Sequence, residues 1–253
     1  MEIAPGIRRL GAGLVNVYLI EEAGAVTIVD AGAPGHWKDL PVELAAMGRS
    51  LDDVRALVLT HAHVDHVGFA ERIRRERAVP VSVHADDAAL ARGEVKPVRD
   101  PTGPGYRGWS IRALAGFAVF ALTHGMTKVT PIAEVGMMLD GATLDLPGAP
   151  RVIHVPGHTA GSVAFHVAAR DAVFVGDAYV TRNVITGRRG PHFATTFNAD
   201  HRQAAASLAR LDGIEARHAL PGHGEAWSGG LDEALRLVRE SVPAELREAP
   251  PQS

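Results

Sequence analysis

The sequence predicts an α/β fold in which two mixed β-sheets pack face to face and helices cover their outer faces. Two observations support this fold class. Short apolar runs of strand type occur in both halves of the chain, and in both halves helix-like segments alternate with further strands. Each sheet has to bury a face, so two sheets packed together with helices outside accommodate this order of elements. We find no linker and no exact repeat, and we expect a single domain over residues 1–253.

The first half begins with a predicted β-hairpin, because two β-rich runs flank the turn-like residues 21–24. The fully apolar run at residues 56–59 is typical of a buried strand. Phe69 and Ile73 stand four residues apart with arginines on the other side, which indicates an amphipathic helix. The elements expected here are strands at 15–20, 25–29, 56–59 and 80–84, and helices at 36–47 and 67–77.

An insertion of loop and helix is expected near residues 96–130. Residues 96–107 are rich in proline and glycine, which predicts an exposed loop. Residues 109–123 predict a helix that is apolar almost all round. Such a helix is buried, covers a pocket or pairs with another chain, so a homodimer is one expectation for this protein.

The second half repeats the alternation of strands and helices. We expect strands at 137–139, 143–146, 151–155, 163–167, 172–175 and 217–220, and helices at 200–211 and 231–239. A long loop at 179–198 separates the last group from the earlier strands.

The composition excludes several classes of protein. There is no cysteine, which removes disulfide scaffolds, thiolate metal sites and a cysteine nucleophile, whereas there are 13 histidines. The net charge of -3 argues against nucleic acid and anionic membranes as partners, and no apolar stretch is long enough to span a bilayer. The N-terminus lacks the hydrophobic core of a signal peptide, so we expect a cytoplasmic protein with a small-molecule substrate.

The strongest local signal follows the predicted buried strand at 56–59. The chain there reads Thr-His-Ala-His-Val-Asp-His over residues 60–66. On an extended segment, residues two apart point to the same side, so His61 and His63 can reach one metal ion. As the chain turns into the next helix, Asp65 and His66 point toward a neighbouring position. This spacing predicts two adjacent metal sites built from one loop.

Three further predicted strands end in a glycine-flanked polar residue. These are Pro-Gly-His around His158, Val-Gly-Asp ending at Asp177, and Pro-Gly-His-Gly around His223. Glycine beside each side chain allows tight turns and close approach at a crowded site.

Together with Asp30 in Val-Asp-Ala-Gly, these motifs resemble those of the metallo-β-lactamase-fold superfamily, in family order and over nearly the whole chain. The resemblance implies a four-layer αβ/βα sandwich with metals at one edge between the sheets. It implies that His61, His63 and His158 bind the first metal and that Asp65, His66 and His223 bind the second. It further implies that Asp177 bridges both metals, and that Asp30 orients a ligand histidine through its other ring nitrogen.

The residues then imply a mechanism. Two divalent metals about 3.5–4 Å apart can share a hydroxide that attacks a carbonyl or phosphoryl centre. Histidine and carboxylate ligands suit zinc best here, although iron and manganese are alternatives. Asp65 and Asp177 are the expected catalytic residues, with Asp65 also able to carry a proton to the leaving group.

Within the superfamily, single-domain lactonases and thioesterases resemble this chain most. Asp177, the lack of cysteine and the lack of a signal peptide make a β-lactamase an unfavoured alternative. We therefore predict a hydrolase of a carboxylic ester, lactone or thioester. The alternatives are a mononuclear iron oxidoreductase similar to persulfide dioxygenases, a phosphodiesterase, or a non-hydrolytic biosynthetic member of the fold.

Substrate contacts are harder to assign than metal ligands. Tyr179 lies two residues after Asp177, and either contacts substrate or packs in the fold. His124 and His192 fall in the segments expected to overhang the cleft and are the other candidates. His84 and His154 are expected to be structural, because the seven ligands already complete both metal sites.

Overall fold

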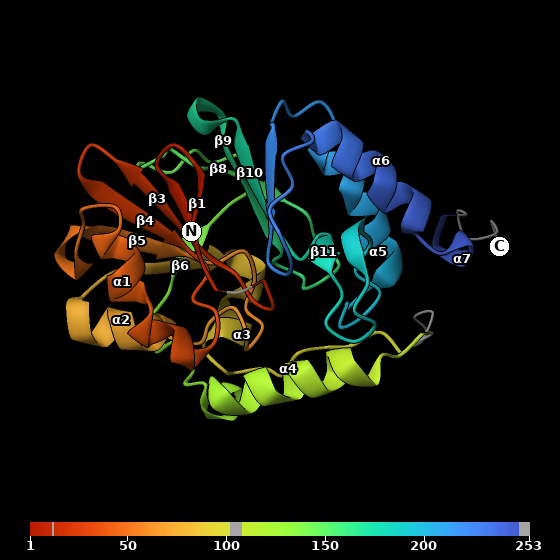
Figure 1. Cartoon of the computed structure of the whole chain (residues 1–253), viewed down its shortest axis with the longest axis horizontal. Coiled ribbons are helices and arrows are strands. Elements are labelled where there is room, and N and C mark those ends of the chain that lie inside the picture. Colours follow the sequence, from red (N-terminus) through yellow and green to blue (C-terminus); the bar gives the residue numbers. More distant parts are fainter. Residues whose placement is uncertain (12, 102–107, 248–253) are drawn as a thin grey trace.

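Two β-sheets form the centre of the molecule (Figure 1). The computed structural model describes residues 1–11, 13–101 and 108–247. The larger sheet has seven strands in sequence order: β1 (Glu2–Ala4), β2 (Ile7–Leu10), β3 (Val17–Glu22), β4 (Ala25–Val29), β5 (Val54–Val58), β6 (Val81–His84) and β7 (Gly136–Met138). Strands β1 to β4 pair antiparallel, and β4 to β7 pair parallel, so the sheet is mixed.

The second sheet contains four strands in the order β13-β10-β9-β8. Their bounds are β8 (Arg151–His154), β9 (Val163–Val167), β10 (Ala172–Gly176) and β13 (His218–Pro221). The β10–β13 pair is parallel and the other pairs are antiparallel, so this sheet is mixed as well. A separate antiparallel hairpin is formed by β11 (Val180–Arg182) and β12 (Arg189–His192).

Helices lie on the outer sides of the two sheets (Figure 1). Their bounds are α1 (Leu40–Ala45), α2 (Ala70–Arg77), α3 (Ala88–Ala91), α4 (Ile111–Thr123), α5 (His201–Ser207), α6 (Leu231–Ser241) and α7 (Ala244–Arg247). In Figure 1, α1 and α2 lie beside the first sheet, whereas α5 and α6 lie beside the second. Helix α4 runs along one edge of the molecule, outside the sheets.

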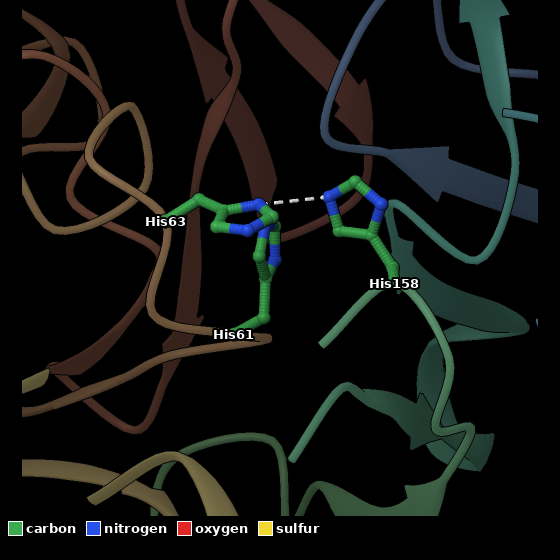
Figure 2. Close-up of side chains that lie close together, drawn as sticks. All are labelled: His61, His63 and His158. Carbon is green, nitrogen blue, oxygen red and sulfur yellow. Dashed lines mark hydrogen bonds between the residues drawn. The ribbon is translucent and has the colours of Figure 1, made fainter. Parts of the chain in front are cut away.

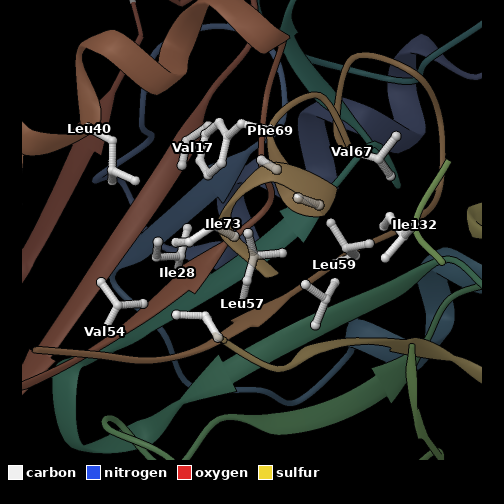
Figure 3. Packing of buried hydrophobic residues seen from close by; sticks show 14 of the residues in the cluster. Val17, Ile28, Leu40, Val54, Leu57, Leu59, Val67, Phe69, Ile73 and Ile132 are labelled. Atoms are coloured by element: carbon white, nitrogen blue, oxygen red, sulfur yellow. The ribbon is translucent and has the colours of Figure 1, made fainter. Parts of the chain in front are cut away.

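Three apolar layers hold these elements together. Figure 3 shows the first layer, where Leu40 of α1 and Ile73 of α2 pack with Ile28 and Leu57 of the larger sheet. A second layer fills the space between the sheets, and a third joins the smaller sheet to α5 and α6. Because side chains alternate along a strand, Leu57 belongs to the first layer and its neighbour Val58 to the second. This arrangement confirms the predicted αβ/βα sandwich.

Most predicted elements occur, with instructive exceptions. The predicted 15–20 and 25–29 hairpin is β3–β4. The strand predicted at 143–146 is wrong, since only a single bridge between Thr143 and Arg151 forms there. The loop predicted at 179–198 contains the β11–β12 hairpin, and β1 and β2 were not predicted. Residues 102–107 of the predicted 96–107 loop lie outside the described residues.

Helix α4 is less buried than its apolar sequence suggests. Phe120 packs against Val15 and Ala33, which fixes one side of the helix to the rest of the protein. The opposite side is in solvent, with Ile111 84% and Leu122 74% exposed. The alternative of a fully buried helix is therefore wrong. Within the described parts of the chain, no helix is long and apolar enough to cross a membrane.

A buried and an exposed position of α1 together test the first apolar layer. Leu44 is fully buried and Val42 is 68% exposed on the same helix. We expect Leu44→Ala to lower the free energy of unfolding by about 2–5 kcal/mol, because it removes buried contacts and leaves a cavity. Val42→Ala should change it by less than about 0.5 kcal/mol. Denaturant unfolding of both variants measures the difference, and equal losses would contradict this packing.

Candidate metal centre

The seven predicted ligand side chains come together at one place between the two sheets. His61, His63, Asp65 and His66 lie in the loop after β5, and the others follow strands of the second sheet: His158 after β8, Asp177 after β10 and His223 after β13. The sandwich therefore joins segments that are as far apart in sequence as residues 61 and 223.

One group consists of three histidines. The ligand atoms of His61, His63 and His158 all lie within 4.8 Å of one another. In Figure 2 the rings of His63 and His158 face each other, and His63 Nδ1 is 2.9 Å from His158 Nε2. All three residues come from loops that are held by strands, so their backbone positions are set by the sheets.

A second group contains Asp65, His66 and His223, whose ligand atoms also lie within 4.8 Å of one another. His223 Nε2 is 3.4 Å from Asp65 Oδ2, and His66 Nε2 is 4.0 Å from the same oxygen. Asp177 lies beside this group, because its Oδ2 is 3.1 Å from His223 Nε2 and its Oδ1 is 3.7 Å from His66 Nε2.

Asp177 also contacts the three-histidine group. Its Oδ2 is 3.4 Å from His158 Nε2, and its ligand atom lies within 4.8 Å of that of His61. One carboxylate therefore reaches both groups, which is the geometry needed to bridge two cations.

The residues fit a metal ion on two grounds. Ligand atoms placed about 2.0–2.2 Å from a tetrahedral ion are about 3.3–3.6 Å apart, which is close to several of these separations. In addition, His61 Nε2, His66 Nε2 and Asp177 Oδ1 are buried and have no hydrogen-bond partner among the described residues. Buried polar atoms without partners are costly, and a bound cation would satisfy them.

The second ring nitrogen of four histidines is held by a partner. Asp30 Oδ2 lies 2.9 Å from His66 Nδ1, Asn198 Oδ1 lies 2.8 Å from His158 Nδ1, and Thr60 Oγ1 lies 3.1 Å from His61 Nδ1. The carbonyl oxygen of Leu14 contacts His223 Nδ1. Each partner turns the opposite nitrogen, Nε2, toward the cluster and favours one tautomer.

Asp30 has a second role in the same region. Its Oδ1 accepts a hydrogen bond from the backbone N–H of Thr60 at 2.7 Å, directly before the histidine-rich loop. The backbone of Asp30 has a φ of 63°, which is uncommon outside glycine. This conformation, held by the fold, brings the carboxylate between the loop and His66.

The pKa values of the histidines differ between the two groups. Burial is the main cause that lowers the pKa of His63 to about 3, and it also lowers the pKa values of His61 and His158. These imidazoles are therefore neutral near pH 7, and a neutral imidazole has a free lone pair for a metal.

In the second group, nearby carboxylates control the pKa of His66. Burial would lower the pKa of His66, but Asp30, Asp177 and Asp65 together raise it to about 10. The neighbouring histidines in turn keep the pKa values of Asp65 and Asp177 low, although burial opposes this. A cation that binds here would replace the proton on His66, so metal binding is expected to release protons.

Asp87 is a buried residue that the sequence patterns did not single out. Its Oδ2 accepts hydrogen bonds from the backbone N–H of Ala62 at 2.8 Å and from Thr159 Oγ1 at 2.7 Å. Its Oδ1 accepts one from the N–H of Gly161 at 2.8 Å. One carboxylate thus joins the histidine-rich loop to the turn that carries His158. The Asp-Asp pair after the strand at 81–84 was the only sequence signal, and it does not distinguish Asp87 from its neighbour.

A cavity of about 600 Å³ opens beside the cluster. Five of the predicted ligands line it: His63, Asp65, His158, Asp177 and His223. The remainder of its wall comes from Val64, the segment around 96–99, α4 and the residues just after it, the β11–β12 hairpin and residues 194–197. A small molecule in this cavity would lie directly against the candidate metal site.

The three predicted substrate contacts are not among the described residues that line this cavity. Tyr179 is fully buried, and its hydroxyl oxygen has no partner within the described chain. It packs in the apolar layer beneath the site, which favours the packing alternative. His192 is buried against the Gly190 carbonyl, and His124 stacks on Phe120. Their positions argue against substrate contact in this conformation.

His84 and His154, expected to be structural, stack on each other with ring centres 4.1 Å apart. With Asp86 they form a further histidine and carboxylate group of metal-binding type. His154 Nε2, however, already contacts the carbonyl oxygen of Ala160 at 2.8 Å. This contact supports a structural role for His154 and for His84, on which it stacks.

Comparison with known proteins identifies the family. Residues 10–223 match the family described as the metallo-beta-lactamase superfamily, so the chain belongs to that superfamily. It is similar to a Bacillus subtilis protein described as probable metallo-hydrolase YflN, with 26% identity over 240 residues that cover 90% of this chain and 87% of that protein. A solved structure, the metallo-beta-lactamase family protein TTHA1429 from Thermus thermophilus, has a TM-score of 0.63 and 26% identity, covering 94% of this chain and 77% of that one.

A further relative has a more specific name. The Gallus gallus protein named acyl-coenzyme A thioesterase MBLAC2 is 27% identical over 184 residues, which cover 67% of this chain. The matched region spans 59% of that relative's length. The fold, the histidine and aspartate groups and the family together indicate divalent metal ions in this site.

The link through Asp87 can be tested against its exposed neighbour. We expect Asp87→Asn to lower the free energy of unfolding of the metal-free protein by at least about 2 kcal/mol, because charge-assisted bonds are lost and an amide N–H₂ faces buried donors. Asp86→Asn should change it by less than about 0.5 kcal/mol. Denaturant unfolding with chelator measures both, and similar losses for the two variants would show that Asp87 does not join the two segments.

Proposed function

We propose that this protein is a dinuclear metal-dependent hydrolase that cleaves a carboxylic ester, lactone or thioester, most favourably with zinc. The observation that carries the proposal is the shared position of Asp177. Its carboxylate lies within 3.4 Å of His158 Nε2 on one side and within 3.1 Å of His223 Nε2 on the other. A single-metal site does not require a carboxylate between two ligand groups.

The two groups of donors support an assignment of residues to each ion. His61, His63 and His158 would hold one, Asp65, His66 and His223 would hold the other, and Asp177 would contact both. When bound, divalent metals in such a site polarise a substrate oxygen and supply hydroxide from water near neutral pH. The chain has no cysteine thiolate to offer, and histidine with carboxylate is a common zinc donor set, although iron and manganese accept it as well.

The protein's own contribution is positioning, charge and proton transfer. The partners of the Nδ1 atoms hold the rings of His61, His66, His158 and His223 in fixed orientations, so little reorganisation is needed during the reaction. Asp65 lines the cavity and is close to His223, so its carboxylate is placed to carry a proton. In the overall reaction, water oxygen bonds to the carbonyl carbon and the carbon–oxygen or carbon–sulfur bond breaks. One proton of the water passes to the leaving alkoxide or thiolate, and the other leaves with the acid product.

The choice of ester, lactone or thioester has two supports. The cavity wall is largely apolar, which suits an acyl group more than a phosphodiester. The similarity to a relative named as an acyl-coenzyme A thioesterase points to the same class of carbonyl substrate.

Metal analysis and activity together test this function. We expect close to two metal ions per chain, and we expect His61→Ala and Asp177→Ala each to lower kcat/KM for model esters or thioesters by more than about 100-fold. The reason is that even partners outside the ligand set commonly cost 10–100-fold in metalloenzymes. His166→Ala is the matched control, since this histidine lies on β9 and its ring contacts the carbonyl oxygen of Glu215, away from the ligand groups.

Two results would overturn the proposal. The first is a full reaction rate in the His61→Ala/His63→Ala double variant. The second is one iron per chain with oxygen consumption on a persulfide substrate, which would identify the oxidoreductase alternative. A panel of lactones, thioesters, phosphodiesters and β-lactams then ranks the hydrolytic substrates.

A further inference from the structure

The cavity beside the candidate metal centre has a positively charged lining. Lys96, Arg99 and Arg182 all line it, the first two from the segment before α4 and the third from β11. These cations come from two different parts of the fold, so their convergence on one cavity is a product of the tertiary structure.

Few carboxylates stand beside these cations in the described part of the cavity wall. Asp65 and Asp177 are the only acidic residues among the described residues that line the cavity, and both belong to the metal cluster. Within the described chain, neither Lys96 nor Arg182 forms a salt bridge with a carboxylate. Metal ions would also neutralise the two aspartates. The cavity therefore presents net positive charge to whatever enters it.

The same cavity is apolar elsewhere. Val98, Phe117, Met126, Val180 and Val184 line it, from the insertion on one side and from the β11–β12 hairpin region on the other. Arg99 also stacks over Phe197, with its guanidinium carbon 4.5 Å from the ring centre, so one cation is placed directly on the apolar wall. A purely polar anion would leave these side chains without a partner, and a purely apolar molecule would bury the cations.

We propose that the substrate is an amphipathic anion: an acyl ester or thioester with an apolar chain and a separate phosphate or carboxylate group. The chain packs against Phe117 and Met126, and the anionic group binds Lys96, Arg99 and Arg182. Arginine is suited to this task because its planar guanidinium forms paired hydrogen bonds with either group. This inference rests on the proposed function, because it assigns the cavity to the substrate of that hydrolase.

Binding of thioethers tests the proposal without requiring turnover. S-octyl-coenzyme A carries phosphates, 3-(octylthio)propionate carries a carboxylate, and S-octyl-N-acetylcysteamine is neutral, while all three share the apolar chain and lack the cleavable carbonyl. Calorimetric titration of the metal-loaded protein should show at least one anionic thioether binding about tenfold or more tightly than the neutral one. Its affinity should fall as salt rises, whereas the affinity for the neutral compound should not.

Variants of Arg182 test whether this residue produces the preference for the anionic thioether. Arg182→Gln should reduce the preference for the anionic thioether about tenfold, and Arg182→Lys should restore part of it. Arg188→Gln is the matched control, because Arg188 is exposed near the same hairpin and is not among the described residues that line the cavity. It should keep the preference of the unmodified protein.

The outcomes separate this inference from the proposed function. Equal affinities for anionic and neutral thioethers, or equal effects of Arg182→Gln and Arg188→Gln, overturn the inference even if ester or thioester hydrolysis is found. A charge preference that depends on Arg182 supports it even if the hydrolysis assays fail, in which case the proposed reaction is the part that is wrong. Tighter binding of the coenzyme A compound identifies phosphate as the anion, and tighter binding of the propionate identifies carboxylate.

Discussion

The contact of Asp177 with both histidine groups is the interaction on which the rest of the site depends. Its carboxylate lies at the end of β10, between His158 on one side and His223 on the other. Burying a carboxylate among imidazoles is unfavourable unless cations or protons accompany it. Since His61 Nε2, His66 Nε2 and Asp177 Oδ1 lack partners within the described chain, hydrogen bonding there does not satisfy the whole cluster. Metal ions would resolve both problems at once.

The sandwich fold makes this contact geometrically available. The apolar layer between the sheets fixes the larger sheet, which carries the histidine-rich loop, against the smaller one, which carries Asp177. Two carboxylates then fix the segments that carry the ligands. Asp30 joins Thr60 to His66, and Asp87 joins the loop to the turn that presents His158. Buried charge-assisted hydrogen bonds of this kind hold ligands in place more firmly than apolar packing, because they specify direction as well as distance.

Segments outside the two main sheets form much of the cavity wall. Phe117 of α4 and Arg182 of β11 lie on elements outside the two main sheets, yet both line the space beside the cluster. The metal centre would supply the same chemistry to many substrates, so the proposed selectivity rests on the residues that line the cavity. In the proposal made above, the apolar wall with its cations distinguishes substrates by their combination of chain and charge.

The fold class and the seven ligand candidates followed from the sequence, because apolar periodicity, the spacing within the 60–66 loop and glycine-flanked strand ends are local properties. The sequence also selected Asp30 by its motif. It did not reveal Asp87 or Asn198, whose partners are distant in sequence. It left Tyr179 open between substrate contact and packing, and the fold buries that side chain completely. It also missed β1, β2 and the β11–β12 hairpin, which are short strands with weak patterns. Only the tertiary structure decided which side chains line the cavity, because that depends on how separate elements pack and not on any one segment.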